Sequence, residues 1–443
     1  MPKKKSIFDK NNFRLKIPAS LQKIVECNPP HSVYVVGGTV RNAIAGLEGS
    51  DWDICGPING EELKLPEGAI SNVIQSRLGV VQIRLDDDVY EYTPFRVEEY
   101  LSDSHTPEKI EFVDGIWDDY KRRDFACNAV YYNLSTNKLD DICSGVSDSH
   151  QHILRMVHDR VFINDGLRIL RMVRIAAETG FDIESQTSKA ATSNLKLLDG
   201  ISAERKRVEL DKILSADIRY NVEHAHIEGV AKLINFGILE YISDGFGDIN
   251  KGMCECLKDI EPNLRLAVLL YFCQDPSKVL SDLKYSNAIT KECKDILNAT
   301  DLFVLKNFSD KHNGAMDFAI KILKPHQFRH ICVENFDIID DVLKLLKALT
   351  NLNSSDKLYN LDAQEIGWIC DNISINIEII KSENVPTSIK ALDIDGNDLI
   401  KAGIEPSNIG AVLKYLWSYC IDDPSLNIKR MLKKMAKTYV KSE

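Results

Sequence analysis

The segment 33–56, which reads VYVVGGTVRNAIAGLEGSDWDICG, constrains the fold of this chain more than any other stretch. Residues 33–36 predict a short buried strand, because the run is β-branched and aromatic, and residues 39–46 predict a short helix. Gly37 and Gly38 lie between the two. Paired glycines let a backbone approach a bulky anion, and a helix start offers unpaired N–H groups to phosphate.

A second short strand is expected after this helix, and it carries Asp51 and Asp53. Their side chains should project from one face, because strand side chains alternate. Two carboxylates this close repel each other unless a cation lies between them, and Mg²⁺ takes oxygen ligands and leaves positions for phosphate. Taken alone, a Gly-Gly pair is typical of a tight turn, and an Asp-x-Asp is typical of a solvated loop. In strand–glycine–helix–strand order, they predict a phosphate and metal site for nucleotidyl transfer.

The composition limits the class of protein. A chain of 443 residues predicts two to four domains, and 44% hydrophobic with 27% charged residues is ordinary for a soluble globular protein. No apolar run reaches the length of a membrane span, and the N-terminus lacks a secretory signal core. Eleven cysteines without a CxxC pair indicate reduced thiols, so we expect a cytoplasmic protein. With a net charge of −11, any nucleic-acid surface must be a local basic stripe.

Between residues 70 and 115 the pattern predicts a small mixed β-sheet. Residues 72–85 alternate apolar and polar side chains, residues 86–88 predict a hairpin turn, and residues 89–98 predict the returning strand. Another strand is expected at 110–113. The opening carboxylates would therefore lie on the strands of a sheet with helices packed on it.

The run Lys121-Arg122-Arg123-Asp124 is the first basic cluster. Three consecutive cations repel each other unless anions are present, and guanidinium groups bind phosphate with bidentate geometry. Asp124 could orient an arginine or cap the helix that follows. The alternative is a solvated charge run. The position of these residues just after the carboxylate-bearing sheet favours a role in phosphate binding.

Residues 162–184 predict a helix that Asn164 or Asp165 can cap. Asp165 can pair with Arg168, and a fixed Asp/Arg pair has the donors and acceptors that reading a base edge requires. Arginines that could meet nucleotide phosphates recur every three residues on one slowly drifting face: Arg168, Arg171 and Arg174. The alternative is an amphipathic helix with a solvated arginine face.

After Gly200 the periodicity is almost entirely helical, and residues 351–356 are the best linker candidate. The most basic segment is the predicted last helix, 427–441. We expect a nucleic-acid backbone to lie against its cations, although basic residues also favour a helix C-terminus through the helix dipole. The candidate RNA-binding residues are Lys429, Arg430, Lys433, Lys434 and Lys437.

Together these residues resemble the class II tRNA nucleotidyltransferases (CCA-adding enzymes) and the bacterial poly(A) polymerases, within the polymerase beta-like nucleotidyltransferase superfamily. Five motifs in order over residues 33–215 carry the resemblance: Gly37-Gly38-x-x-Arg41, Asp51-x-Asp53, Arg122-Arg123-Asp124-Phe125 with Asn128-Ala129, Asp165-x-x-Arg168 continuing to Arg171 and Arg174, and Ala203-Glu204-Arg205 with Glu209-Leu210. Residues 391–413 also resemble the tail of the longer bacterial CCA-adding enzymes.

The resemblance implies an α+β fold, with a polymerase beta-like head (a small mixed β-sheet with helices) followed by an all-α neck, body and tail. The implied boundaries are a catalytic head at 1–148, a base-recognising neck at 149–225, a body at 226–350 and a tRNA-binding tail at 351–443. The implied activity is template-independent addition of C, C and A to the 3′ end of tRNA from CTP and ATP, with release of pyrophosphate. A poly(A) polymerase, or a partial enzyme that adds only CC or only A, is the alternative. The body and tail would contact the acceptor stem and elbow of tRNA.

The resemblance also implies residue roles. Asp51 and Asp53 would hold two Mg²⁺ ions, and Glu91 is the choice for a third catalytic carboxylate, with Glu98 and the turn aspartates as competitors. Asp165 and Arg168 would hydrogen-bond to the base of CTP or ATP. The implied nucleotide-binding residues are Gly37, Gly38, Arg41, Arg122, Arg123, Asp124, Asp165, Arg168, Arg171 and Arg174.

Three positions depart from the family pattern. Asn42 stands where the family usually has Asp, and Asn164 stands where it usually has Glu. The segment 99–109 lacks the usual glycine- and arginine-rich character, and this loop is expected to influence the switch from C to A addition. These departures raise questions about Asn42 as a metal ligand and about the start of the base-reading helix.

Overall fold

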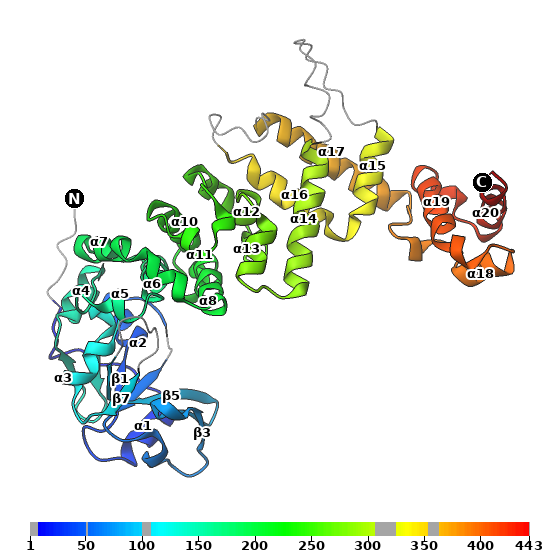
Figure 1. The fold of residues 1–443 in the computed structure, drawn as a ribbon. Helices are drawn as coiled ribbons and strands as arrows, with labels where there is room; N and C mark the ends of the chain where they lie inside the picture. The colour runs from blue at the N-terminus through cyan, green and yellow to red at the C-terminus, as the bar shows by residue number, and fades with distance from the viewer. Residues whose placement is uncertain (1–7, 50–51, 100–107, 306–324, 353–362, 443) are drawn as a thin grey trace. The chain divides into compact units, whose positions relative to one another are not determined.

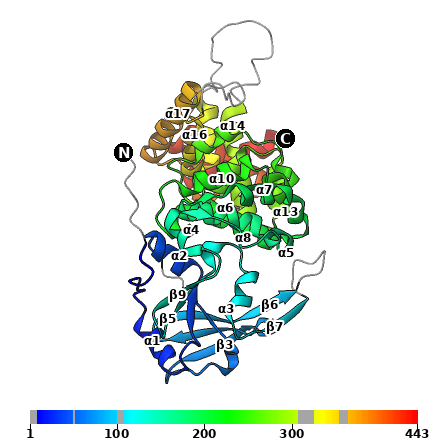
Figure 2. The same ribbon diagram turned by 90° about the vertical axis from the view of Figure 1, so that its left-hand side faces the viewer.

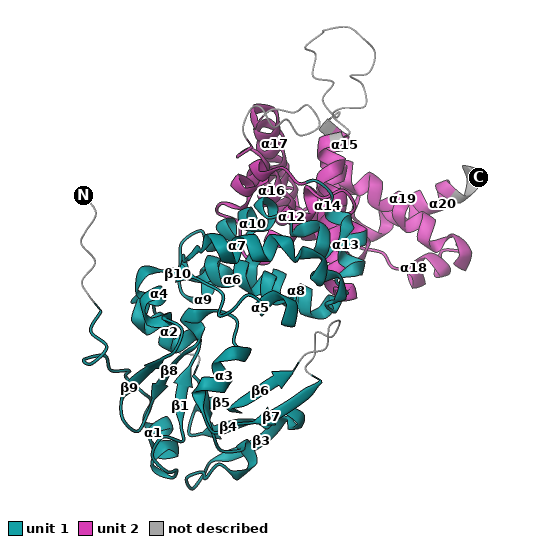
Figure 3. Cartoon of the chain, turned by 60° about the vertical axis from the view of Figure 1, so that its left-hand side comes forward, with its two compact units in different colours: residues 1–248, 278–284 teal, residues 249–277, 285–443 magenta. Residues whose placement is uncertain are grey.

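The computed structural model describes residues 8–49, 52–99, 108–305, 325–352 and 363–442, and in this part of the chain a β-sheet region precedes a long series of helices (Figure 1). This arrangement confirms the expected α+β fold. The chain forms two compact units, residues 1–248 with 278–284 and residues 249–277 with 285–443 (Figure 3). The four-part division into head, neck, body and tail stays a prediction.

Within the described residues, the first unit contains a seven-stranded sheet in the order β3-β4-β5-β2-β1-β8-β9. Its strands are β1 (Tyr34–Val36), β2 (Asp53–Gly56), β3 (Ile70–Gln75), β4 (Val80–Leu85), β5 (Asp88–Pro94), β8 (Val130–Asn133) and β9 (Lys138–Asp141). Neighbours are antiparallel except β2 and β5, which are parallel. A separate antiparallel pair, β6 (Arg96–Glu99) and β7 (Lys109–Phe112), lies beside α3 (Ile116–Asp119) (Figure 2).

The expected returning strand at 89–98 was wrong as a single element. It divides at Phe95 into β5 and β6, which belong to different sheets. Pro94 ends β5, since proline has no N–H to continue the ladder. The backbone N–H of Phe95 then donates to the Gly56 carbonyl at 2.7 Å, and its carbonyl accepts from Val113. This break turns Arg96 and Glu98 away from the path of β5.

The alternation of side chains in β1 and β2 produces two different faces. On one face, Val35 and Ile54 join a core with α1 (Ala19–Glu26) and α2 (Gly38–Ala45). On the other face, Tyr34, Val36 and Cys55 pack with Phe95 and Tyr131. Asp53 lies two residues before Cys55 and therefore shares this second face.

Further helices of the first unit pack around α6 (Arg168–Thr179), in which every residue except Arg171 is buried. The predicted alternative of a solvated arginine face is therefore wrong. The helix expected after a cap at Asn164 or Asp165 is α6, which begins at Arg168 and follows the short helix α5 (Val161–Asn164). The other elements are α4 (Gly145–Gln151), β10 (Ile153–Leu154), β11 (Asp182–Ile183), α7 (Ser185–Ser193), α8 (Ala203–Leu214), α9 (Ala216–Arg219), α10 (Ala225–Asn235) and α11 (Leu239–Ile242).

The described elements of the second unit are all helices. The remaining helices are α12 (Arg265–Tyr271), α13 (Pro276–Asp282, mostly in the first unit), α14 (Asn287–Leu305), α15 (Pro325–Glu334), α16 (Ile339–Leu349), α17 (Ala363–Ser382), α18 (Gly396–Lys401), α19 (Ile409–Asp422) and α20 (Lys429–Ser442). Leu399, Leu416 and Leu432 join the last three helices in a core of their own. Most of the expected linker lies outside the described residues. No described helix is long and apolar enough to cross a membrane.

Candidate active site

A cavity of about 810 Å³ lies in the first unit, and its walls come from the head and from helices α6 and α8. Its volume is typical of a small-molecule site. Most predicted site residues line it: Gly37, Gly38, Arg41, Asp53, Arg122, Arg123, Asp124, Asp165, Arg168, Arg171 and Arg174. Asp51 lies outside the described residues, as does most of the segment 99–109. The fold therefore brings motifs from more than a hundred residues of sequence to one place.

The glycine pair forms the turn from β1 into α2. Gly37 has a φ of 83°, a conformation that glycine adopts at low cost, and it precedes the first residue of α2. The backbone N–H of Arg41 donates to the Gly37 carbonyl at 3.1 Å and closes the first turn. Both glycines line the cavity, so backbone rather than side chains forms this part of its wall.

Asp53 and Glu91 lie directly opposite each other on the parallel strands β2 and β5. Residues in register on neighbouring strands project from the same face of the sheet, so the two carboxylates share a face. Asp53 lines the cavity, whereas Glu91 is exposed and is not among the lining residues. Glu98, the competing candidate, lines the cavity and accepts a 2.7 Å hydrogen bond from Nε of Arg96.

Asp119, which was not among the residues predicted from the sequence, organises the basic run. Its carboxylate is fully buried and accepts hydrogen bonds from Arg122 at 2.7 Å, Arg123 at 3.1 Å and the Tyr131 hydroxyl at 2.6 Å. Burial alone would raise the pKa of Asp119, but the two guanidinium groups outweigh burial and lower the pKa to about 2. The signal was present in the sequence, because an acid three and four residues before two arginines can pair with both.

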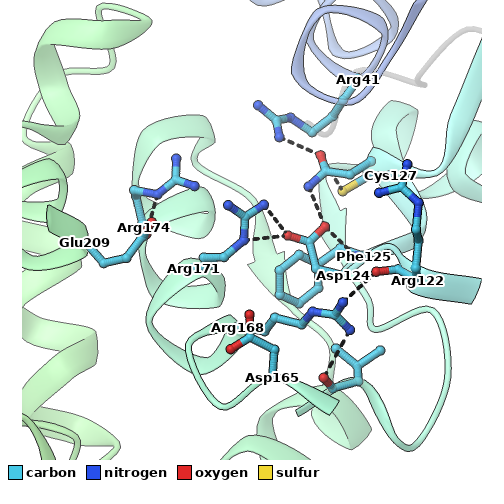
Figure 4. A network of polar contacts seen from close by, with 12 residues as sticks. Arg41, Arg122, Asp124, Phe125, Cys127, Asp165, Arg168, Arg171, Arg174 and Glu209 are labelled. Atoms are coloured by element: carbon cyan, nitrogen blue, oxygen red, sulfur yellow. Dashed lines mark hydrogen bonds and ion pairs between the residues drawn. The ribbon is translucent and has the colours of Figure 1, made fainter. Parts of the chain in front are cut away.

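Asp124 connects the head to helix α6 (Figure 4). Its Oδ2 accepts from Arg171 at 2.6 Å, and its Oδ1 accepts from the amide of Asn128 at 3.0 Å. The Oδ1 of Asn128 in turn accepts from Arg41 at 2.7 Å. Burial opposes ionisation of Asp124, but Arg171 and Asn128 hold its pKa well below the usual range. The expectation that Asp124 orients an arginine is confirmed, and this chain of contacts orders Arg41 and Arg171 together.

Asp165 does not pair with Arg168 as expected. Its Oδ2 accepts from Nη2 of Arg205, on helix α8, at 2.8 Å, and its Oδ1 accepts from the backbone N–H of Leu167 at 3.1 Å. Arg168 instead donates to the carbonyls of Val161 and Arg122, at 3.2 and 2.5 Å. Asp165 and Arg168 still line one cavity, but they have different partners, and Figure 4 shows the contact between Arg168 and Arg122.

Arg174 has two carboxylate partners. It is only 5% exposed, and it donates to Glu178 at 2.8 Å and to Glu209, on α8, at 2.7 Å. The contact with Glu209 ties α6 to α8 in the cavity wall. Contact between Arg174 and a nucleotide phosphate stays a prediction.

The predicted RNA-binding residues of α20 belong to the second unit and divide into two groups. Lys429 and Lys433 form ion pairs with Asp398, at 2.7 and 3.3 Å. The others are exposed, and their spacing of four and three residues places them on one helix face: Arg430, Lys434 and Lys437. We call this second group the basic face of α20, and its contact with RNA stays a prediction.

The fold and the cavity define a nucleotidyltransferase. Residues 33–155 match the family described as the poly A polymerase head domain. Residues 180–244 match the family described as the probable RNA and SrmB-binding site of polymerase A. The first match includes Asp53, Asp124 and the sheet, and the second covers helices that follow α6.

Relatives that match over more of this chain show which family it belongs to. A CCA-adding enzyme of Lactobacillus helveticus is 30% identical over 281 residues, which are 61% of this chain and 67% of that protein. Another, from Levilactobacillus brevis, is 28% identical over 86% of this chain and 88% of its own length. The fold matches the crystal structure of the Bacillus stearothermophilus CCA-adding enzyme in complex with CTP with a TM-score of 0.67, at 20% identity, over 96% of this chain and 100% of that one. The chain belongs to the CCA-adding enzyme family.

Proposed function

We propose that this protein adds C, C and A in turn to the 3′ end of tRNA, using CTP and ATP and releasing pyrophosphate. The observation that carries the proposal is the single cavity that joins Asp53 to Asp165 and Arg168. A carboxylate for metal-assisted phosphoryl chemistry and a polar pair for base recognition then face one bound nucleotide. The names of the relatives support the same reaction.

The base-selecting residues are Asp165 and Arg168. Cytosine and adenine both present an exocyclic amine next to a ring nitrogen acceptor, whereas uracil and guanine present a carbonyl next to a ring N–H. A carboxylate can accept from the amine and a guanidinium can donate to the ring nitrogen, so the pair fits C and A and opposes U and G. The protein itself selects the base without a nucleic-acid template.

Asp53 is the described member of the metal site, with Asp51 and Glu91 as its assigned partners. Within the described ranges no group of three or more His, Cys, Asp or Glu side chains is placed to hold a metal, and Asp51 lies outside those ranges. The donor set fits Mg²⁺, which usually takes one or two carboxylates and completes its shell with substrate phosphates and water. We assign two Mg²⁺ ions to this site. When bound, they would lower the pKa of the primer hydroxyl and neutralise charge on the phosphates.

The chemical step is an in-line displacement. The 3′-hydroxyl oxygen of the tRNA attacks the α-phosphorus of CTP or ATP, and its proton passes to solvent. The bond from the α-phosphorus to the bridging oxygen breaks, and pyrophosphate leaves with that electron pair. The guanidinium groups of Arg41, Arg122 and Arg123 stabilise the triphosphate, and Asp119 and Asp124 hold them in place.

The substrate RNA is tRNA, contacted at its acceptor stem and elbow by the helical segments and by the basic face of α20. We place the reaction in the cytoplasm. All eleven cysteines lie in the described ranges and none of them forms a disulfide, as is usual in a reducing compartment.

The test is the product formed on a tRNA that lacks its 3′ CCA, with Mg²⁺ and all four nucleoside triphosphates. The expected product ends in CCA and nothing longer. A long A-tract made on a generic RNA primer without use of CTP would select the poly(A) polymerase alternative, and a product ending in CC or extended only by A would select a partial enzyme. Asp53→Ala should abolish incorporation while tRNA binding persists, and normal turnover by that variant would remove the metal assignment.

A further inference from the structure

Arg96 is a further guanidinium beside the run Arg122-Arg123-Asp124. It begins β6, lines the cavity and is only 6% exposed. Its Nε donates to Glu98, and its backbone N–H donates to Oδ1 of Asp119 at 3.1 Å. Among the described residues, neither Nη1 of Arg96 nor Nη2 of Arg122 has a hydrogen-bond partner, although both atoms are buried.

This cluster carries more guanidinium groups than carboxylates, so its electrostatic energy is unfavourable unless a further anion binds. Three guanidinium groups, those of Arg96, Arg122 and Arg123, share the carboxylates of Glu98 and Asp119 in one hydrogen-bonded cluster. Burial lowers the pKa of Arg96, and the nearby Arg122 lowers it further. Like charges in a poorly solvated place repel each other strongly, and a buried unpaired donor costs free energy.

We propose that Arg96 and Arg122 together bind the β- and γ-phosphates of the incoming nucleoside triphosphate, the part that leaves as pyrophosphate. The inference rests on the proposed function and adds Arg96 as a substrate-contacting residue and Glu98 as its positioning residue. Phosphate oxygens match two guanidinium groups, because each can accept from a fork of N–H donors.

The position of these two donors favours a terminal polyphosphate over an RNA phosphodiester as their ligand. Both offer the same oxygens, but the two donor atoms are almost inaccessible to solvent and belong to arginines of the cavity wall. A flexible chain end can enter such a place, whereas an RNA backbone must continue on both sides of each phosphate. Gly37, Gly38 and Asp53 line the same cavity and would face the α-phosphate side of the nucleotide.

The experiment measures binding of inorganic tripolyphosphate to the full chain by calorimetry, in metal-free buffer and with Mg²⁺. Arg96→Gln should weaken binding about ten- to a hundredfold, the usual loss for a charge-assisted hydrogen-bonding group. Arg96→Lys should weaken it less, because the charge remains and the fork is lost. Arg84→Gln, at an exposed arginine of β4 that does not line the cavity, is the matched control and should bind as the wild type does.

Wild-type affinity in folded Arg96→Gln would overturn the inference. If thermal melting shows that Arg96→Gln does not fold, Arg96→Lys decides, and unchanged tripolyphosphate affinity in that variant would also overturn it. A short single-stranded RNA provides the second arm: if Arg96→Lys weakens RNA binding but not tripolyphosphate binding, the anion is an RNA phosphate and the proposal is wrong.

Glu98→Gln tests the positioning role. It should raise the KM for CTP and weaken inhibition by pyrophosphate, with a smaller change in kcat, because it loosens a phosphate contact and leaves the reacting carboxylates in place. A fall in kcat with no change in the KM for CTP would count against that role. Since tripolyphosphate binding needs no turnover, Arg96-dependent binding without CCA addition would refute the proposed function alone.

Discussion

The carboxylate of Asp165 is held by Nη2 of Arg205 over 2.8 Å, across 40 residues of sequence. The contact joins the turn between α5 and α6 to the first turn of α8, and both residues line the cavity. A base-reading carboxylate discriminates well only if its own position is fixed, since a mobile acceptor adapts to several partners. In the proposed function, Arg205 would therefore act on base selection by positioning Asp165.

Arg205→Ala should reduce discrimination against UTP and GTP by several-fold to about tenfold, the worth of roughly 1 kcal/mol in a partly exposed ion pair. The measurement is kcat/KM for each of the four nucleotides on a CCA-lacking tRNA. Arg205→Lys should restore part of the selectivity. Arg207→Ala on the same helix, outside the cavity, is the control. Unaltered rejection of UTP and GTP by folded Arg205→Ala would show that Asp165 does not need this partner.

Glu91 and Glu98 can be separated by their expected kinetic effects. Glu91 lies opposite Asp53, so Glu91→Gln should lower kcat about a hundredfold and raise the Mg²⁺ concentration needed for half-maximal activity. Glu98 is bonded to Arg96, so Glu98→Gln should leave the Mg²⁺ requirement unchanged. If the Mg²⁺ requirement shifts with Glu98→Gln and not with Glu91→Gln, Glu98 is the third carboxylate.

Asn42 is a site where a single change should stabilise the fold. It is 1% exposed, its Oδ1 accepts from Nε of Arg41, and its Nδ2 is a buried donor without a partner among the described residues. Asn42→Asp removes this donor and gives Arg41 an anion, so the free energy of unfolding should rise by about 1 kcal/mol. Urea unfolding measures it. Asn128→Asp is the contrasting variant and should destabilise the protein, because it places a carboxylate against Asp124. A loss of stability in Asn42→Asp would contradict this interpretation of the buried amide.

The buried Asp119 should make stability depend on acid pH. Its pKa is about 2 in the folded protein, against 3.8 for an unperturbed group. A depressed folded-state pKa adds stability above the unfolded-state pKa, and that stability is lost as the pH falls from about 4 toward 2. The full effect is about 2 kcal/mol, with about 1 kcal/mol lost between pH 5 and pH 3. Denaturant unfolding across this range should show a shallower pH dependence for Asp119→Asn than for the wild type. Parallel curves would mean that other carboxylates dominate.

The basic face of α20 should account for the salt-dependent part of RNA binding. Replacing Arg430, Lys434 and Lys437 by Gln should weaken tRNA binding and reduce the slope of log affinity against log salt by about 1 for each phosphate that is no longer bound. Lys429→Gln with Lys433→Gln is the matched control, since both lysines already pair with Asp398. Equal effects of the two sets on the salt slope would remove the distinction between them.

Several elements could be predicted because their causes are local. The strand, glycine turn and helix at the start of the chain appear as β1 and α2, and the turn at residues 86 and 87 joins β4 to β5. These depend on backbone propensity and on side-chain period over a few residues. The single returning strand at 89–98 failed because a proline ended the ladder, and the Asp165–Arg168 pair failed because backbone carbonyls and Arg205 were better placed.

The residue types of the site could be predicted from local motifs, because metal, phosphate and base chemistry each require particular groups. Which of these groups contact one another depends on the folding of distant segments together. Asp124 finds Arg171 across 47 residues, and the guanidinium of Arg41 contacts the Tyr220 hydroxyl across 179. The tertiary structure also leaves one donor of Arg96 and one of Arg122 buried without a partner among the described residues. Such contacts follow from the packing of whole helices and strands against one another, whereas sequence periodicity reports only neighbours within a helical turn or along one strand.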